Sequence, residues 1–272
     1  MSYVNEMFGL EGKVVVITGG GGIIAGAMSE ALLKSGAKVV LWDIVQDSMD
    51  AAKERLTEST GMGENVFGVV VDTTDEKSVA DAIAKTETDF AIPNVLINAA
   101  GGNRGKSPFV ETDVETFQFV LKLNIIAGLV VPTKIMAKYW IDKDIKGSIV
   151  NLTSMSSYIP LSGVWAYDAA KAAVLNLTMA TAKEFAPNGI RVNAIAPGFF
   201  VGKQNKALLI KDDKTGELTD RGKDIIRHTP FGRFGDVCEL AGATVFLVSD
   251  KAAGFISGVS LAVDGGYLVD NI

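Results

Sequence analysis

The fold is decided by residues 14–26, which read VVVITGGGGIIAG. The first five residues are all β-branched, a composition that favours a buried strand. Glycines at positions 19–22 and 26 follow, and residues 27–35 have the apolar periodicity of an amphipathic helix. Because a strand, a glycine-rich turn and a helix in this order form half of a β-α-β unit, we expect a fold built from such units.

The glycine-rich turn is suited to binding a dinucleotide. Glycines allow the backbone to turn tightly and to approach a pyrophosphate, whose charge is stabilised by the N–H groups at the start of a helix. Asp43 stands at the tip of the next predicted strand, where an acidic side chain accepts hydrogen bonds from ribose hydroxyls. Its charge would repel a 2′-phosphate, which favours NAD over NADP as the cofactor. The alternative for Asp43 is an ordinary solvated turn residue.

Six further short runs of β-branched residues follow, separated by longer helical patterns, an alternation typical of parallel strands joined by helices. One α/β domain accounts for all 272 residues. We predict a doubly wound sheet of seven mainly parallel strands, with helices on both faces and a ligand crevice at the carboxyl ends of the strands. The predicted strands cover residues 14–18, 39–42, 66–71, 95–98, 148–152, 191–195 and 260–263.

Two other strand ends offer residues to a dinucleotide. Asp72 and Thr73 follow the third strand, where Asp72 is placed to reach the adenine. The sequence Asn-Ala-Ala-Gly at residues 98–101 ends the fourth strand, and its small side chains would let the dinucleotide lie against the sheet. The alternative for each is a simple strand terminus.

Tyr167 and Lys171 stand four residues apart in an apolar helical pattern, and Ser154 lies just after the fifth strand. Positions i and i+4 share a helix face, so the Lys171 ammonium can lower the pKa of the Tyr167 phenol from about 10 by roughly 1–3 units. The phenol would then be a usable proton shuttle. The alternative is a half-buried tyrosine beside a solvated lysine, but the predicted dinucleotide site favours the catalytic interpretation.

Composition narrows the range of partners. The formal net charge of −6 disfavours nucleic acid and anionic membranes, so the expected partners are small molecules and copies of the chain. The single cysteine, Cys238, and single histidine, His228, exclude a disulfide framework and a Cys/His metal cluster, so we expect no metal.

The sequence also bears on location. Residues 1–10 do not resemble a secretory signal. The most apolar stretch, residues 119–131, is interrupted by Lys122 and Asn124 and is short for a membrane span. We therefore expect a cytoplasmic protein.

The alternation of strands and helices lapses at about residues 199–233. This segment contains a hydrophilic piece, residues 211–223. Because so long an excursion inside a compact domain is more often functional than idle, we predict a lid over the active site. The alternative is a disordered surface insertion.

These motifs together resemble the short-chain dehydrogenase/reductase family over nearly the whole chain. The resemblance rests on Thr18-Gly19 with its glycine loop, residues 98–101, Asn124, Ser154, Tyr167-x-x-x-Lys171 and Pro197-Gly198. It implies a Rossmann-type single domain, commonly a homotetramer, in which Asn124, Ser154, Tyr167 and Lys171 form a catalytic tetrad. It also implies that Pro197, Gly198 and the residues after them close over the nicotinamide.

The family pattern assigns the residues that hold NAD. They are Gly19, Gly22, Ile23, Ile24, Asp43, Asp72, Thr73, Asn98, Ala99, Ala100, Gly101, Tyr167, Lys171, Pro197, Gly198 and Phe200. The chain departs from the family's Thr-Gly-x-x-x-Gly-x-Gly pattern, because Ile23 and Ala25 replace the second and third glycines. Glycines at positions 20–22 and 26 would compensate, and the pyrophosphate turn would be shifted.

Within the family, several stretches look most like a D-mannonate oxidoreductase (fructuronate reductase) subgroup. They are residues 101–103, 197–200, 204–205 and 228–235. The resemblance implies hydride transfer between NAD(H) and a sugar acid, D-mannonate or D-fructuronate. The alternatives are a dehydrogenase for another sugar, polyol or gluconate-type acid, and a non-catalytic dinucleotide sensor.

The carboxylate of a sugar acid requires a cation or several hydrogen-bond donors in the binding site. The hydroxyls of the sugar acid require amide groups. The expected substrate-binding residues are Asn103, Arg104, Ser154, Tyr167, Phe199, Gln204 and Asn205. For Arg104, the charged residue among them, the alternative is a solvated surface position.

Overall fold

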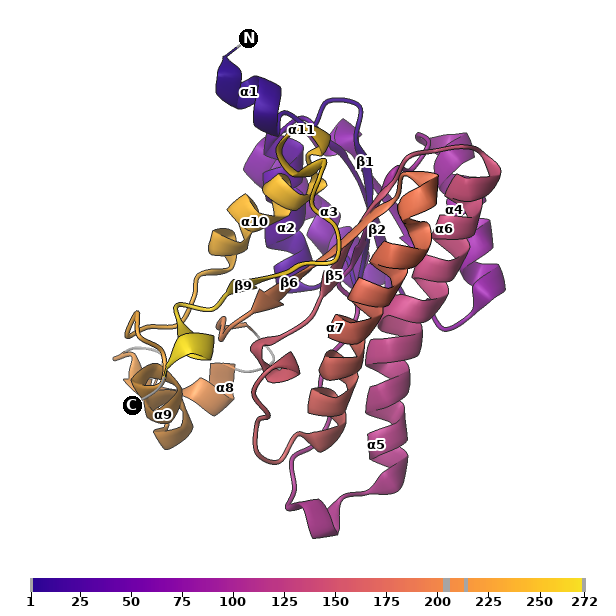
Figure 1. Cartoon of the computed structure of the whole chain (residues 1–272). Coiled ribbons are helices and arrows are strands. Elements are labelled where there is room, and N and C mark those ends of the chain that lie inside the picture. Colours follow the sequence, from indigo (N-terminus) through magenta and orange to yellow (C-terminus); the bar gives the residue numbers. More distant parts are fainter. Residues whose placement is uncertain (1, 203–205, 213–214, 271–272) are drawn as a thin grey trace.

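The protein is described by a computed structural model for residues 2–202, 206–212 and 215–270 (Figure 1). Its centre is a seven-stranded sheet in the order β3-β2-β1-β4-β5-β6-β9, and all six pairings are parallel. The predicted sheet is therefore confirmed. The strands are β1 Val14–Thr18, β2 Lys38–Asp43, β3 Val66–Val70, β4 Val95–Asn98, β5 Ser148–Leu152, β6 Arg191–Pro197 and β9 Ser260–Val263.

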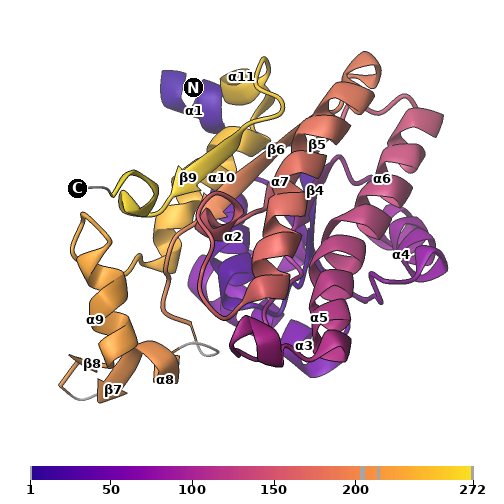
Figure 2. The same ribbon diagram turned by 60° about the horizontal axis from the view of Figure 1, so that its bottom comes forward.

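Helices cover both faces of the sheet (Figures 1 and 2). Along β1, Val15 and Ile17 belong to one buried apolar cluster, whereas Val14 and Val16 belong to another. Successive residues of a strand point to opposite faces, so an all-apolar strand supplies both clusters. The first face carries α2 Ile23–Lys34, α3 Gln46–Thr60 and α10 Ala241–Val248. The second carries α4 Glu76–Asp89, α5 Val114–Leu121, α6 Val131–Asp142 and α7 Trp165–Phe185.

The strand order reverses between β1 and β4, and a parallel sheet opens a ligand crevice at such a switch point. One side chain joins the two strand ends there. The Thr18 hydroxyl accepts hydrogen bonds from the backbone N–H groups of Ala99 and Ala100, both at 3.0 Å. These two hydrogen bonds hold the carboxyl ends of β1 and β4 together at the switch point.

Helix α2 begins at Ile23, four residues earlier than predicted. Gly22 is its extended N-cap, and the Gly26 N–H donates to the Gly22 carbonyl at 2.9 Å, which closes the first turn. The predicted start was wrong because residues 23–26, which belong to the first turn of the helix, were assigned to the glycine-rich turn. The turn before the helix is thus formed by the four glycines at 19–22.

A continuous helix covers Val114–Asp142, in which the π-helical segment η3 Lys122–Val130 joins α5 to α6. The helix has 29 residues, and the mean hydropathy of its most apolar 18-residue window is 1.7, so it is long and apolar enough to cross a membrane. The expectation that no stretch reaches this length was wrong, because the helix continues through Lys122 and Asn124. Half of its most apolar window is buried against the rest of the fold, as in a core helix, so the length is weak evidence for a span.

The segment after β6 leaves the sheet and folds outside it (Figure 2). Its described elements are α8 Lys206–Leu209, the antiparallel pair β7 Ile210–Asp212 and β8 Glu217–Leu218, and α9 Asp220–Arg227. Thr219 links them, since its N–H donates to the Leu209 carbonyl and its hydroxyl to the Leu208 carbonyl. The remaining elements are α1 Tyr3–Phe8, α11 Asp250–Ala253, η1 Gly63–Asn65, η2 Phe109–Glu111, η4 Met155–Ser157, η5 Ala186–Asn188, η6 Val237–Leu240 and η7 Tyr267–Val269.

Candidate active site

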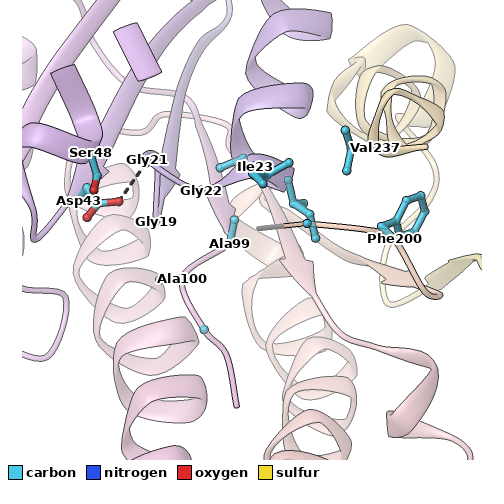
Figure 3. Close-up of a pocket in the computed structure, with 14 residues that line it drawn as sticks. Gly19, Gly21, Gly22, Ile23, Asp43, Ser48, Ala99, Ala100, Phe200 and Val237 are labelled. Atoms are coloured by element: carbon cyan, nitrogen blue, oxygen red, sulfur yellow. Dashed lines mark hydrogen bonds between the residues drawn. The ribbon is translucent and has the colours of Figure 1, made fainter. Parts of the chain in front are cut away.

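A cavity of about 510 Å³ opens at the carboxyl ends of β1, β2 and β4. Figure 3 shows the glycine turn running along it between Asp43 and Ile23. Its volume falls within the range of small-molecule and cofactor sites. It is lined by Gly19, Gly21, Gly22, Ile23, Ile24, Ala25, Asp43, Ser48, Ala99, Ala100, Gly101, Phe200, Gly202 and Val237.

The glycine turn is packed so closely that side chains would not fit. A Cβ on Gly20 would lie 2.8 Å from the Cβ of Leu41, and one on Gly21 would lie 2.7 Å from the Cβ of Ser48. Gly19 has a φ of 64°, in the left-handed region that favours glycine. Because the N-cap Gly22 has no side chain, the first N–H groups of α2 remain open to an anion. The turn therefore fits a pyrophosphate.

Asp43 is fixed beside this turn. Its Oδ2 accepts a hydrogen bond from the Gly21 N–H at 2.9 Å (Figure 3), and its Oδ1 accepts one from the Val45 N–H at 3.0 Å. Both oxygens retain a further lone pair for ribose hydroxyls. Asp43 is the sole ionisable side chain among the described residues that line the cavity.

Seven residues predicted to bind the cofactor lie outside this lining. Four of them, Tyr167, Lys171, Pro197 and Gly198, line a second cavity described below, and the other three line neither cavity. Asp72 and Thr73 are half-buried after β3, and the Asp72 carboxylate accepts a hydrogen bond from the Thr74 N–H at 2.8 Å, which lowers the pKa of Asp72. Asn98 is buried, and its amide donates to Thr133 and Asn151 within the core. The Asn98 amide nitrogen thus holds β4 to its neighbours, and the role of Asn98 in cofactor binding stays a prediction. Sequence reasoning missed Ser48 and Val237, since each belongs to a helical pattern that gives no sign of the cavity.

A second cavity of about 390 Å³ continues from the first, since Ile24, Ala99, Gly101 and Phe200 line both. The structure brings several predicted residues together around it. These are Asn103, Ser154, Tyr167, Lys171, Pro197, Gly198 and Phe199. The proposed chemistry and the proposed dinucleotide site therefore share one continuous space.

Ser154, Tyr167 and Lys171 form one wall of the second cavity. Ser154 follows β5 and caps η4, where its hydroxyl accepts the Ser156 N–H at 3.2 Å, and α7 carries the other two residues. The Lys171 ammonium donates to the Leu152 carbonyl at 2.7 Å and lies 5.6 Å from the centroid of the Tyr167 ring. The tyrosine and the lysine therefore share a helix face, as predicted.

The expected direction of the Tyr167 pKa was wrong for this structure. Desolvation raises the pKa of Tyr167, and a hydrogen bond with Ser154 opposes the rise without reversing it. Desolvation also lowers the pKa of Lys171 to about 8. Burial thus has the largest effect on both pKa values, and the i, i+4 argument had left it out.

Asn124 lies in η3 and is buried just behind the second cavity. Its amide donates to the Gly102 carbonyl at 2.7 Å and accepts the Gly102 N–H at 3.1 Å. It also donates to the Val120 carbonyl at 2.9 Å. Asn124 therefore fixes the chain that follows β4 to the long helix.

The structure places some of the predicted substrate-binding residues at the second cavity and others elsewhere. Arg104 is exposed, lies outside the second cavity, and places its guanidinium 5.2 Å from the centroid of the Phe119 ring. Gln204 and Asn205 fall outside the described residues. Arg221 and Leu208, which the sequence did not single out, line the second cavity from α9 and α8. The only sequence signal for Arg221 was its position within the predicted lid.

Comparisons with known proteins agree with this architecture. A family model described as enoyl-(acyl carrier protein) reductase matches residues 22–268. A protein of Haemophilus influenzae named as an uncharacterized oxidoreductase is 37% identical, over 95% of this chain and 94% of its own.

Solved structures cover nearly the whole chain. A proposed D-mannonate oxidoreductase from Haemophilus influenza with bound NAD has a TM-score of 0.87 and 34% identity, and the match covers 98% of this chain and 99% of that one. A gluconate 5-dehydrogenase from Burkholderia cenocepacia in complex with NADP and tartrate has a TM-score of 0.86 and 29% identity, with the same coverage. The chain belongs to the short-chain dehydrogenase/reductase family and is an oxidoreductase.

Proposed function

We propose that the protein transfers a hydride reversibly between NAD(H) and a hydroxyl-bearing carbon of a sugar acid, with D-mannonate and D-fructuronate as the substrate pair. The observation that carries the proposal is the single wall formed by Ser154, Tyr167 and Lys171, in a cavity continuous with a pyrophosphate-fitting turn. The D-mannonate name belongs to the Haemophilus structure and supports the choice of substrate here.

The dinucleotide would be held by the glycine turn, Asp43, residues 99–101 and the chain after β6. Bound there, the nicotinamide supplies the hydride acceptor for oxidation and the hydride donor for reduction. NAD is favoured over NADP because the described lining contains one carboxylate and no lysine or arginine that would pair with a 2′-phosphate. The Burkholderia relative binds NADP. Similarity to relatives therefore does not decide the cofactor, and the choice of NAD here rests on the residues that line this protein's own cavity.

The chain's own groups would handle the proton. In the oxidising direction the Tyr167 Oη, as phenolate, takes the proton of the substrate hydroxyl, while the Ser154 Oγ donates a hydrogen bond to the same oxygen. A positive charge on Lys171 stabilises the Tyr167 phenolate before it accepts the proton of the substrate. Asn124 acts indirectly, since it holds the backbone of Gly102 next to Gly101 at the cavity.

We further infer that residues 199–233 act as a lid on a single catalytic and dinucleotide-binding domain. Phe199, Phe200, Leu208 and Arg221 from this segment line the second cavity, where they would exclude water from the hydride path. We also infer a cytoplasmic homotetramer, and size-exclusion chromatography with light scattering tests the assembly.

The function is tested by the rate of NADH formation with a panel of D-mannonate, D-gluconate and neutral polyols, repeated with NADP. We expect D-mannonate to give the highest kcat/KM and NAD to be preferred. Faster oxidation of D-gluconate would keep the sugar-acid class and replace the substrate. Activity on neutral polyols alone would contradict the sugar-acid proposal, and no turnover in either direction would favour a dinucleotide sensor.

A further inference from the structure

One cation faces the reacting wall from the proposed lid. Arg221, on α9, lines the second cavity together with Tyr167 and Ser154, which come from α7 and from the end of β5. We propose that Arg221 binds the carboxylate of the substrate and thereby selects acids over neutral sugars. The proposal rests on the sugar-acid function above and assigns its specificity to one side chain.

Arg221 differs from the other cations of α9 in its ion pairing. On α9, Lys223 pairs with Asp220 at 3.6 Å and Arg227 pairs with Asp224 at 3.1 Å. Arg221 forms no ion pair with any acidic side chain in the part of the chain that the structure describes. Arg221 is a half-buried residue, and an arginine without an ion-pair partner gains more from an anionic ligand than one that is already paired.

The walls of the cavity favour an anion as well. Asp and Glu are absent from its described lining, in which Arg221 and Lys171 are the only cations. Lys171 is already bonded to the Leu152 carbonyl and lies at the reacting end. Arg221 is therefore the cation left for a carboxylate, and its planar fork can bind both carboxylate oxygens.

Arg104, the cation that the sequence had favoured, is poorly placed for this task. It lies over the Phe119 ring and lines a smaller neighbouring cavity of about 190 Å³, beside Asp113 and Glu111. The charge of Arg104 contributes to lowering the pKa of Asp113, after the hydrogen bonds from Thr116 and Glu115. Its charge is thus directed to a local carboxylate outside the reaction cavity.

Two aromatic residues connect Arg221 to the rest of the cavity wall. Tyr267 of η7 is close enough for the Arg221 charge to oppose the rise that desolvation causes in the Tyr267 pKa. The Tyr267 ring packs edge-to-face on Phe199, with ring centroids 5.3 Å apart, and Phe199 itself lines the cavity. Arg221 is therefore part of a wall that includes residues far apart in the sequence.

The test compares Arg221→Gln and Arg221→Lys with Arg227→Gln, a matched control on the exposed side of the same helix. KM and kcat are measured for the best sugar acid and for a neutral polyol. Loss of a charged hydrogen bond predicts that Arg221→Gln raises KM for the acid roughly 10- to 100-fold, with little change in kcat or in KM for the polyol. Arg221→Lys should recover part of the loss, and Arg227→Gln should match the wild type.

Equal losses for acid and polyol in Arg221→Gln, or a loss of acid binding in Arg104→Gln alone, would overturn the assignment while leaving the sugar-acid function intact. If the wild type oxidises only polyols, the function fails and inhibition of that reaction by D-gluconate tests Arg221 separately. Weaker inhibition of Arg221→Gln than of wild type would then support the anion site. Equal inhibition, or none in either protein, would overturn it.

Discussion

The ammonium of Lys171 lies 5.6 Å from the centroid of the Tyr167 ring and donates its hydrogen bond to the Leu152 carbonyl. The two side chains share one desolvated wall, and burial disfavours the charged form of each: it raises the pKa of Tyr167 and lowers that of Lys171 to about 8. Both groups belong to the reacting wall, so the pH dependence of the reaction reports on both.

Oxidation of the substrate is therefore expected to speed up as the pH rises, because only the phenolate of Tyr167 can accept the hydroxyl proton. Reduction needs the phenol and should show the opposite trend. Lys171→Met should move the ascending limb of the oxidation profile to higher pH, since no positive charge then stabilises the phenolate. Profiles of kcat/KM in both directions check this, with the exposed Lys183→Met on the same helix as the control. Superimposable profiles for Lys171→Met and wild type would contradict the role of the lysine.

Two glycines near the turn should respond in opposite ways to alanine. At Gly20 the new Cβ would meet the Cα of Leu41 at 3.0 Å, so the turn must move and the affinity for NAD should fall at least about tenfold. At Gly26 the Cβ would enter open space within α2, and alanine should stabilise the protein by about 0.5–1 kcal/mol. Calorimetric NAD binding and Tm values test the pair. Equal NAD affinity in both variants would show that the turn is not the pyrophosphate site.

Asn124→Ala should destabilise the protein strongly. The change removes two partly buried hydrogen bonds to Gly102 and a buried one to the Val120 carbonyl, and each such bond contributes about 0.5–1.5 kcal/mol. We expect a loss of about 2–4 kcal/mol in the free energy of unfolding, measured by urea titration. Asn188→Ala, at an exposed position, is the control and should change little. An unchanged midpoint for Asn124→Ala would mean that these bonds do not hold the loop.

Asp43→Asn should shift the cofactor preference toward NADP. Removing the carboxylate charge removes its repulsion of a 2′-phosphate, an interaction of about 1 kcal/mol or more at close range, while an amide oxygen can still accept one of the two backbone bonds. The ratio of kcat/KM for NADP to that for NAD should rise by about tenfold or more. Asp47→Asn, exposed on α3, should leave the ratio unchanged. Retention of the wild-type ratio by Asp43→Asn would remove the basis for assigning NAD.

The sheet was predictable because each buried strand is a short β-branched run, apolar on both faces, bounded by turns. The seven predicted strands differ from the observed ones by at most two residues at an end, the largest difference being the extension of β6 to Pro197. The start of α2 was missed because helix N-caps and glycine turns have the same composition. The join of α5 to α6 was missed because Lys122 and Asn124 look like interruptions until a partner such as Gly102 is in place.

The site was predictable where one helix or one strand end sets the geometry, as for Tyr167, Lys171 and Asp43. It was not predictable where function depends on packing between distant segments. Asn98 is a polar residue at a strand end, where a cofactor contact is expected, yet its amide donates to Thr133 and Asn151 in the core. Arg104 carries the charge expected of a residue that binds a carboxylate, yet its guanidinium lies over the Phe119 ring. Arg221 reaches the cavity only because α9 folds back outside the sheet, which no local pattern specifies.

The account is tested most directly by measuring turnover and NAD affinity for Tyr167→Phe. The matched control is Tyr158→Phe, whose ring follows η4, is 45% exposed and lies outside the lining of the second cavity. We predict that Tyr167→Phe loses a factor of about 10² to 10⁴ in kcat, because the proton acceptor is removed, while its Kd for NAD stays close to that of the wild type. Substantial turnover by Tyr167→Phe, or an equal loss in Tyr158→Phe, would contradict the account.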